Sequence, residues 1–169
     1  MMHHDPNNFW EQLERLEKLI RASELKAGVV FSFHSLILGL FADRLEHFSQ
    51  VFNGNPWLIA LAILWLTSVL ISIFYCFKCF RPQIELKYDK NVFFFRDAAR
   101  SFGDAKEFSE NIIDVCTDET KLFKQLSEQI HVESKIIDEK FKSVNKSIRF
   151  FALSFIFIIL ILLVTAINL

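Results

Sequence analysis

Two arginines, Arg96 and Arg100, stand four residues apart at the end of the segment FFFRDAAR. On a helix, residues four apart face the same way, and two guanidinium groups so arranged suit the oxygens of a phosphate. The ring of Phe94 offers a face on which a nucleobase can stack, and Asp97 can accept a hydrogen bond from a base or a ribose hydroxyl. These four residues form a candidate ligand-binding site. The alternative is an ordinary amphipathic helix with Phe in a core and Arg in water.

A second candidate is His34, which lies within an uncharged apolar stretch. An ionisable side chain at membrane depth usually faces a helix bundle or a water-filled space, so His34 is a candidate for membrane gating. The alternative is a neutral imidazole that is hydrogen-bonded to a neighbouring serine. Cys76 and Cys79 stand three positions apart, but neither a second pair nor a nearby His completes a metal site. We therefore interpret both as wall residues of a helix and expect no metal.

No motif in the sequence points to catalysis. There is no Walker loop, no GxGxxG, no GxSxG and no HExxH, and the 4 Gly are too dispersed for a phosphate cradle. We therefore expect no catalytic residue, no cofactor and no enzyme. A net charge of −1 provides no basic field for nucleic acid, and the 3 scattered Cys do not form a disulfide framework.

Apolar and charged residues occupy separate blocks of the 169-residue chain, in which 52% of the residues are hydrophobic and 23% are charged. Three blocks carry no charge: 27–42, 57–77 and 150–169. As helices, the second and third would be roughly 30 Å long, which is the thickness of a bilayer core. The first would reach roughly 24 Å, so a buried soluble helix or a re-entrant segment is an alternative there. We favour a span, because the next span needs a way back across the membrane.

Lys and Arg are distributed unevenly around the three predicted spans. Of the 19 in the chain, only Arg44 falls in the loop 43–56, and the others lie in 1–26 and 78–149. The positive-inside rule places the N-terminus and the region 78–149 in the cytoplasm, with the loop 43–56 and the C-terminus outside. We therefore expect a multi-pass membrane protein with a cytoplasmic N-terminus.

Residues 1–26 are predicted to form an amphipathic helix. Asp5 is placed to cap it, and Pro6 suits the first helical position because that position needs no donor. One stripe follows the helical repeat along this segment: Phe9, Leu13, Leu16, Ile20, Ser23 and Ala27. No breaker separates the stripe from the first span, so we expect the helix and the span to be one rod that packs against a protein partner.

The region 78–149 is predicted to be a helical sensor and stalk. An extended connector at 83–95 precedes a short helix after Asp104, and Thr117 and Asp118 signal a new helix start near Glu119. From there an apolar row recurs every seven residues: Phe123, Ile130, Ile137, Val144 and Phe151, with Phe141, Ile148 and Phe155 beside it. Neither Gly nor Pro interrupts the row, so one helix of about 50 residues is expected to run through the third span.

These segments predict an all-α integral membrane protein with three transmembrane helices, a helical cytoplasmic region and a long stalk helix continuous with the last span. The charges around the row are compatible with coiled-coil-like packing of the stalk against the N-terminal helix or against a neighbouring subunit. A packed hairpin within the chain is the alternative, and the sequence does not decide between them.

Three short motifs occur in a fixed order along the chain. Residues 24–28 (ELKAG) lead into the first span, residues 94–100 read FFRDAAR, and residues 134–137 (SKII) with Lys140, Phe141 and Val144 precede the last span. In this order, and from about residue 24 to the C-terminus, the chain resembles the transmembrane effector family of the Pycsar antiphage systems. It departs from the family at Arg96, Asp97 and Ala98, where the family more often has Gly, His and Ile.

The resemblance implies a function. A cyclase encoded by an adjacent gene would make a cyclic pyrimidine mononucleotide, cUMP or cCMP, on phage infection. The effector would sense this ligand and impair the integrity of the bacterial inner membrane, so that the cell dies in an abortive infection. We also expect a homo-oligomer, because three spans in a single chain cannot surround a conducting hole.

Two other functions are compatible with the residues. One is a membrane scaffold that anchors a soluble partner through its coiled-coil stalk. The other is a holin-like toxin that permeabilises membranes without a ligand, for which the long region between the second and third spans would be surplus.

Overall fold

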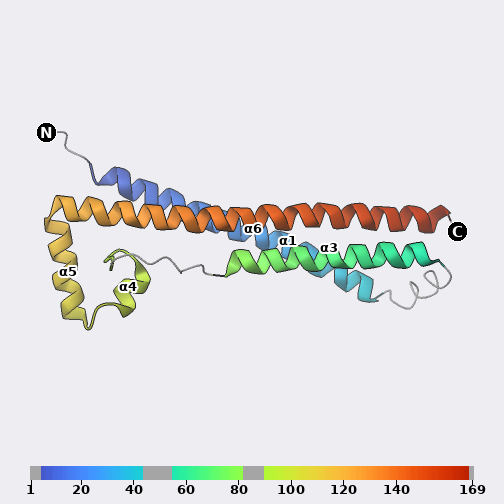
Figure 1. Ribbon diagram of the computed structural model, residues 1–169, viewed down its shortest axis with the longest axis horizontal. Coiled ribbons are helices and arrows are strands. Elements are labelled where there is room, and N and C mark those ends of the chain that lie inside the picture. Colours follow the sequence, from blue (N-terminus) through green and yellow to red (C-terminus); the bar gives the residue numbers. More distant parts are fainter. Residues whose placement is uncertain (1–4, 44–54, 82–89, 168–169) are drawn as a thin grey trace. The chain divides into compact units, whose positions relative to one another are not determined.

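The computed structural model describes residues 5–43, 55–81 and 90–167. The helices in these ranges are α1 (Asn7–Asp43), α3 (Pro56–Phe80), α4 (Phe95–Arg100), α5 (Ala105–Thr117) and α6 (Glu119–Ile167), and the described residues contain no strand (Figure 1). Among them α1, α3 and α6 are long and apolar enough to cross a membrane. The predicted fold class is therefore confirmed. Most of the predicted loop 43–56 and connector 83–95 lies outside the described residues.

Side-chain oxygens cap the starts of four helices. Each accepts a hydrogen bond from a backbone N–H of the first turn, where intrahelical partners are missing. The pairs are Asp5 with Asn7 (3.0 Å), Asn55 with Trp57 (3.2 Å), Asp104 with Glu107 (2.8 Å) and Asp118 with Thr120 (2.9 Å). The starts predicted at Asp5, Asp104 and Asp118 are confirmed, and α1 begins at Asn7, one residue after Pro6.

The chain divides into two compact units, and α1 and α6 contribute residues to both. The first unit comprises Met1–Arg21 and Gln83–Asp138, and the second comprises Ala22–Pro82 and Glu139–Leu169. Along α1 the predicted stripe is correct, because Leu16, Ser23 and Ala27 are buried. The predicted single rod is also confirmed, since α1 continues without interruption to Asp43.

The second unit is a bundle of three helices. Two contacts between α1 and α6 occur in the same order along both helices: Glu24 accepts a hydrogen bond from Lys140, and further along His34 contacts Phe151. The two helices therefore run parallel. The end of α3 meets the part of α6 where the second unit begins, because the backbone oxygen of Cys79 accepts a hydrogen bond from Lys140. Helix α3 therefore runs antiparallel to α1 and α6. Two apolar clusters fill the bundle. Ala27, Val30, Cys76, Cys79 and Val144 form one cluster, and Leu58, Trp65, Val69 and Ile161 form the other.

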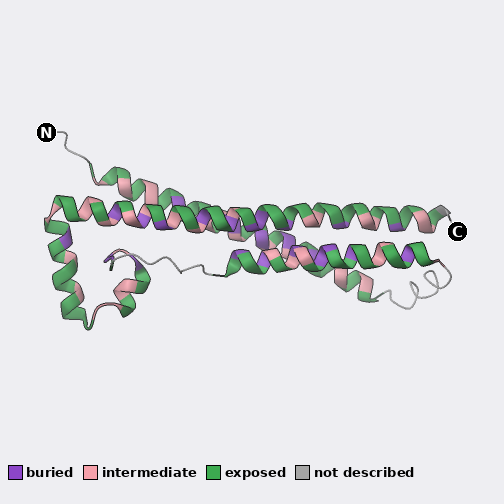
Figure 2. Ribbon diagram, viewed as in Figure 1, coloured by how far each residue is buried: buried purple, intermediate pink, exposed green. Residues whose placement is uncertain are grey.

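The buried positions of α6 differ in part from the predicted row. Ile137 and Val144 are buried as expected, but Ile148 and Phe155 are 40% and 41% exposed. A different set is buried at steps of seven: Lys140, Ser147, Ser154 and Ile161, with Leu126 buried two such steps before Lys140. Figure 2 shows such buried positions recurring along α6 and α3 between exposed ones. Apolar side chains do not mark the interior of a membrane bundle, because lipid is as apolar as a leucine core.

Lys140 connects the three helices of the second unit. Its Nζ donates to Glu24 Oε1 on α1 (2.8 Å) and to the backbone oxygen of Cys79 on α3 (2.6 Å), and its side chain is only 7% exposed. The Cys79 oxygen belongs to the last turn of α3, where carbonyls lack intrahelical donors and the helix dipole is negative. The buried ammonium thus satisfies a helix end as well as a carboxylate.

Lys140→Ala is expected to destabilise the protein strongly. Removing one partner of a fully buried pair costs about 3–5 kcal/mol. The Glu24 side chain is 40% exposed and can be rehydrated, so we expect a smaller loss, of about 2 kcal/mol. The melting midpoint of the detergent-purified protein measures it. Lys142→Ala, at an exposed position of the same helix, is the control, and equal losses in the two variants would contradict the role of Lys140.

Candidate functional site

Asn91 holds the segment that precedes α4 against α6 through hydrogen bonds. It is 2% exposed, and its Nδ2 donates to the backbone oxygen of Gln125 on α6 (2.8 Å). Its Oδ1 accepts from the backbone N–H of Phe93 (2.9 Å), while the Gln125 Oε1 accepts from the backbone N–H of Val92 (3.0 Å). Because the two bonds to Gln125 join residues more than thirty positions apart, they hold the start of the candidate site against the stalk helix.

The predicted arginine pair lies on a helix. Arg96 and Arg100 are both exposed and stand four residues apart on α4, so their spacing places them on one side of that helix. The aromatic residues divide differently from the prediction. Phe94 is only 5% exposed and precedes the first turn of α4, whereas Phe95 is 70% exposed, with its ring centroid 5.6 Å from that of Phe94.

Asp97 makes contacts within the chain with both carboxylate oxygens. Oδ2 accepts from the backbone N–H of Asn91 (3.1 Å), and Oδ1 accepts from the hydroxyl of Ser101 (3.3 Å). The carboxylate therefore bridges the segment before α4 to the residue after it. A hydrogen bond from Asp97 to a ligand stays a prediction, and it would have to share oxygens that these donors already use.

Aromatic contacts complete the first unit. Trp10 of α1 packs edge-on against Phe93, with ring centroids 5.3 Å apart, and Phe9 packs against Phe123 of α6 at 5.1 Å. The N-terminal part of α1 therefore packs on the stalk part of α6 within one chain. Of the packing modes that the sequence left open, the structure contains the one between the stalk and the N-terminal helix.

Glu133 is an unusual carboxylate in the first unit. Its Oε1 accepts from the Gln129 side chain (2.8 Å), but Oε2 is buried and has no hydrogen-bond partner among the described residues. Burial raises the pKa of Glu133, and the charge of Glu17 on α1 raises it further, while the bond from Gln129 opposes the rise. The ionised form is therefore disfavoured in the packed unit.

His34 faces the interior of the second unit, as predicted. It is fully buried, and its ring lies edge-on to Phe151, with centroids 4.9 Å apart and planes at 86°. Neither ring nitrogen has a hydrogen-bond partner in the described part of the chain. The predicted alternative, a bond to a neighbouring serine, is not found there, and Ser35 bonds the backbone oxygen of Phe31 instead.

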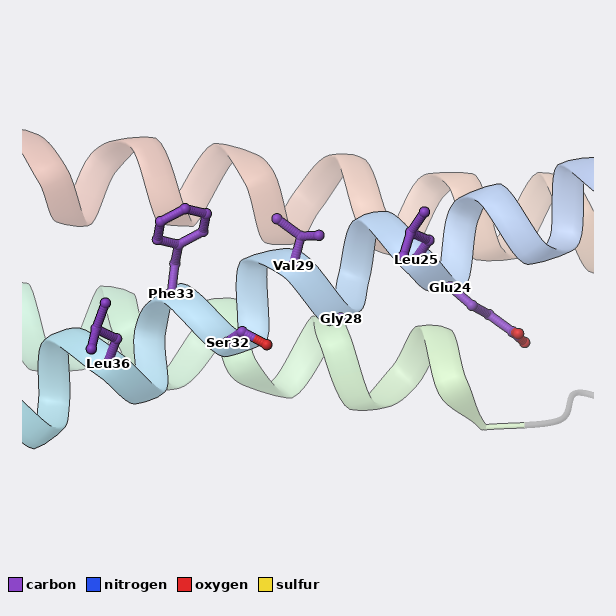
Figure 3. Close-up of a pocket in the computed structure, with 7 residues that line it drawn as sticks. All are labelled: Glu24, Leu25, Gly28, Val29, Ser32, Phe33 and Leu36. Carbon is purple, nitrogen blue, oxygen red and sulfur yellow. The ribbon is translucent and has the colours of Figure 1, made fainter.

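A groove of about 600 Å³ runs along α1 in the second unit (Figure 3). It is lined by Glu24, Leu25, Gly28, Val29, Ser32, Phe33 and Leu36. Gly28 and Ser32 stand four residues apart among the larger side chains of this lining. We did not predict this groove, although small residues four apart in a membrane helix are the pattern that signals close helix approach.

The cysteines of α3 are free and buried, as predicted for wall residues. Cys76 and Cys79 are both 0% exposed, and the Cys76 Sγ lies 3.0 Å from the Ser147 hydroxyl. Across the described ranges, no group of three His, Cys, Asp or Glu side chains could hold a metal ion.

Three helices that are long and apolar enough to cross a membrane, two of which also contribute residues to the first unit, define a multi-pass membrane protein. The family model of the Pycsar effector protein domain matches residues 8–167, so this chain belongs to the Pycsar effector family. It is accordingly an effector of antiphage defence, and the resemblance stated from its motifs is confirmed. No curated protein and no solved structure matches the chain.

Glu133→Gln is expected to stabilise the protein at neutral pH. Because the folded pKa lies above the ordinary value of 4.5, the folded state binds more protons between these two values, and stability falls as the pH rises through that window. Gln keeps the shape without the charge, so its melting midpoint should exceed that of the wild type at pH 8, by the equivalent of about 1 kcal/mol. The gain should shrink at pH 5.

Glu139→Gln, at an exposed position of the same helix, is the control for this pH series. A gain for Glu133→Gln that is no larger at pH 8 than at pH 5 would contradict the burial of the charge.

Proposed function

We propose that this effector senses a cyclic pyrimidine mononucleotide, cUMP or cCMP, and that binding impairs the integrity of the bacterial inner membrane. The ligand is made by a partner cyclase encoded by an adjacent gene. Membership of the Pycsar effector family supports the signal and the outcome. The observation that carries the binding site is the exposed arginine pair on α4, next to an exposed aromatic ring.

The cyclic phosphate binds between the guanidinium groups of Arg96 and Arg100, which provide several charge-assisted donors. The base stacks on the exposed ring of Phe95, which contacts the buried ring of Phe94, its neighbour in the chain. Asp97 orients α4 through Asn91 and Ser101, and it accepts from the ribose or the base if the ligand comes close enough. The ligand is thus held by a strong contact between its phosphate and two cations, and by stacking of its base on an aromatic ring, which does not depend on the identity of the base.

The signal reaches the membrane through α6. The segment before α4 is bonded to Gln125 on this helix, and α6 continues from there to Ile167 without a break. A ligand that binds one arrangement of the stalk better shifts the population towards it by that difference in affinity. A shift from 1:99 to 99:1 needs about 5.5 kcal/mol, which several subunits can share.

The topology follows from the charges. The N-terminus and the region 78–149 lie in the cytoplasm, because the Lys and Arg residues are concentrated there, while the loop 43–56 carries only Arg44. The binding site then meets a diffusible nucleotide in the compartment where a soluble cyclase works. His34 contributes to gating from its buried position in the bundle.

The effector works as a homo-oligomer. The three spans of one chain pack around buried side chains such as His34, Ser72 and Ser147, so a single bundle in this arrangement encloses no open hole. The groove on α1 supports contact with a helix of a second copy, because Gly28 and Ser32 allow two backbones to approach closely.

Reconstituted protein is expected to release a dye from liposomes of bacterial lipids only when cUMP or cCMP is added. Arg96→Ala and Arg100→Ala should each raise the half-maximal nucleotide concentration at least tenfold, since a lost charge-assisted bond costs about 1.4 kcal/mol or more. Lys106→Ala is the matched control, because Lys106 is an exposed cation of the next helix. Leakage without nucleotide would favour the holin-like toxin, and no leakage under any condition would favour the scaffold.

Ser32→Leu is expected to weaken self-association, because the larger side chain fills the groove from which a second copy approaches. Ser35→Leu is the matched control: Ser35 is also exposed, lies one turn further on and does not line the groove. Native mass spectrometry in detergent measures the fraction of oligomer. Equal loss in both variants, or none in Ser32→Leu, would place the contact between subunits elsewhere.

A further inference from the structure

The interior of the membrane bundle is polar along part of its length. The buried row of α6 places Lys140, Ser147 and Ser154 at steps of seven, and α3 contributes buried residues of the same kind. We define the polar seam as these buried side chains of the second unit: His34, Ser68, Ser72, Cys76, Ser147 and Ser154. None is more than 5% exposed. Polar groups at membrane depth are uncommon and usually face a bundle interior or a water-filled path.

Hydrogen bonds in the polar seam join α3 to α6. The Ser72 hydroxyl donates to the backbone oxygen of Ser147 (2.9 Å) and lies 3.2 Å from its hydroxyl. The Cys76 Sγ lies 3.0 Å from the same hydroxyl. In the closed bundle these groups satisfy one another, and water can replace every one of these bonds if the two helices separate.

His34 is the member of the polar seam that the closed bundle does not satisfy. On α1 it lies between Val30 and Ile37, which belong to different apolar clusters. Its ring contacts Phe151, which stands four residues after Ser147 and three before Ser154 on α6. Each buried polar atom without a partner costs about 1–3 kcal/mol. An apolar side chain would avoid this cost in the closed state, so packing of the closed bundle does not account for the imidazole.

Four buried apolar residues of α3 and α6 pack together in the same bundle, and Ser68 of the polar seam stands between two of them, Trp65 and Val69, in the chain. We define the apolar plug as Leu58, Trp65, Val69 and Ile161, each at most 5% exposed. Phe41 of α1 closes against Trp65, with ring centroids only 4.4 Å apart. A packed apolar constriction of this kind excludes water and blocks ions without any charged barrier.

We propose that the polar seam, once α3 separates from α6, lines one wall of the water-filled path by which small ions cross the membrane in the activated homo-oligomer, and that the apolar plug is its closed gate. The inference deepens the proposed function and depends on it for the trigger, because nucleotide binding would supply the bias towards the open bundle. Opening exposes hydroxyls, a thiol and an imidazole to water, and their hydration offsets part of the cost of separating α3 from α6.

The thiol of Cys76 provides a native reporter for this path. In a Cys79→Ser, Cys116→Ser variant it is the remaining cysteine of the chain. In liposomes, a small cationic methanethiosulfonate reagent that does not cross lipid should label it at least tenfold faster when cUMP or cCMP is present. The control variant carries Cys76→Ser in addition, so that no native cysteine remains, together with Leu70→Cys. This last change puts a single thiol on the lipid-exposed side of the same helix. Its labelling should not respond to nucleotide.

A second experiment opens the gate directly. Val69→Ser places a hydroxyl in the apolar plug and is expected to leak ions without nucleotide, whereas Leu70→Ser, one residue further along and exposed to lipid, is expected to stay closed. Size-exclusion chromatography in detergent confirms that both variants are folded. Equal leakage from the two variants, or none from Val69→Ser, would overturn the plug.

The two proposals fail in distinguishable ways. If the wild type leaks on addition of nucleotide while Cys76 stays unlabelled and Val69→Ser is silent, the proposed function stands and the path lies elsewhere. If nucleotide never causes leakage but Val69→Ser leaks and Leu70→Ser does not, the path stands and the assigned trigger is wrong.

Discussion

The arrangement of the membrane bundle depends on one buried ammonium group. Lys140 bonds a carboxylate of α1 and the last turn of α3 at once, so it fixes the level at which the three helices meet. At the same relative placement Ser72 of α3 lies opposite Ser147 of α6, and Ile161 shares an apolar cluster with Leu58 and Trp65. The contacts of the buried polar and apolar residues are all compatible with the level that Lys140 sets at one end of the bundle.

Much of this fold can be predicted from the sequence, because the residues that start a helix and the spacing of its buried residues are local features of the chain. Asp5, Asp104 and Asp118 mark true helix starts, and the stripe on α1 is buried as its spacing requires. The failure at Ile148 and Phe155 has a physical cause. Inside a membrane, hydrophobicity no longer separates core from surface, and the informative residues are the polar ones at the same period. Serines at steps of seven on α6 carried that signal.

The candidate site was only partly predictable for a different reason. Spacing alone places Arg96 and Arg100 on one side of a helix, but three consecutive Phe cannot reveal which ring the fold covers. The segment that contains these rings is held against α6 by the bond between Asn91 and Gln125. A contact between residues so far apart in the chain cannot be predicted from a single sequence. The family could be identified before the fold, because its motifs are local in the chain.

The repeat of serines on α6 has a mechanical consequence. Ser147 and Ser154 are seven residues apart, so a second hydroxyl lies about 10.5 Å from the one that now meets Ser72. Between these two serines, Phe151 packs against the buried cluster and offers Ser72 no hydrogen-bond partner. A displacement of α3 along α6 by one seven-residue repeat would therefore bring Ser72 level with a hydroxyl again.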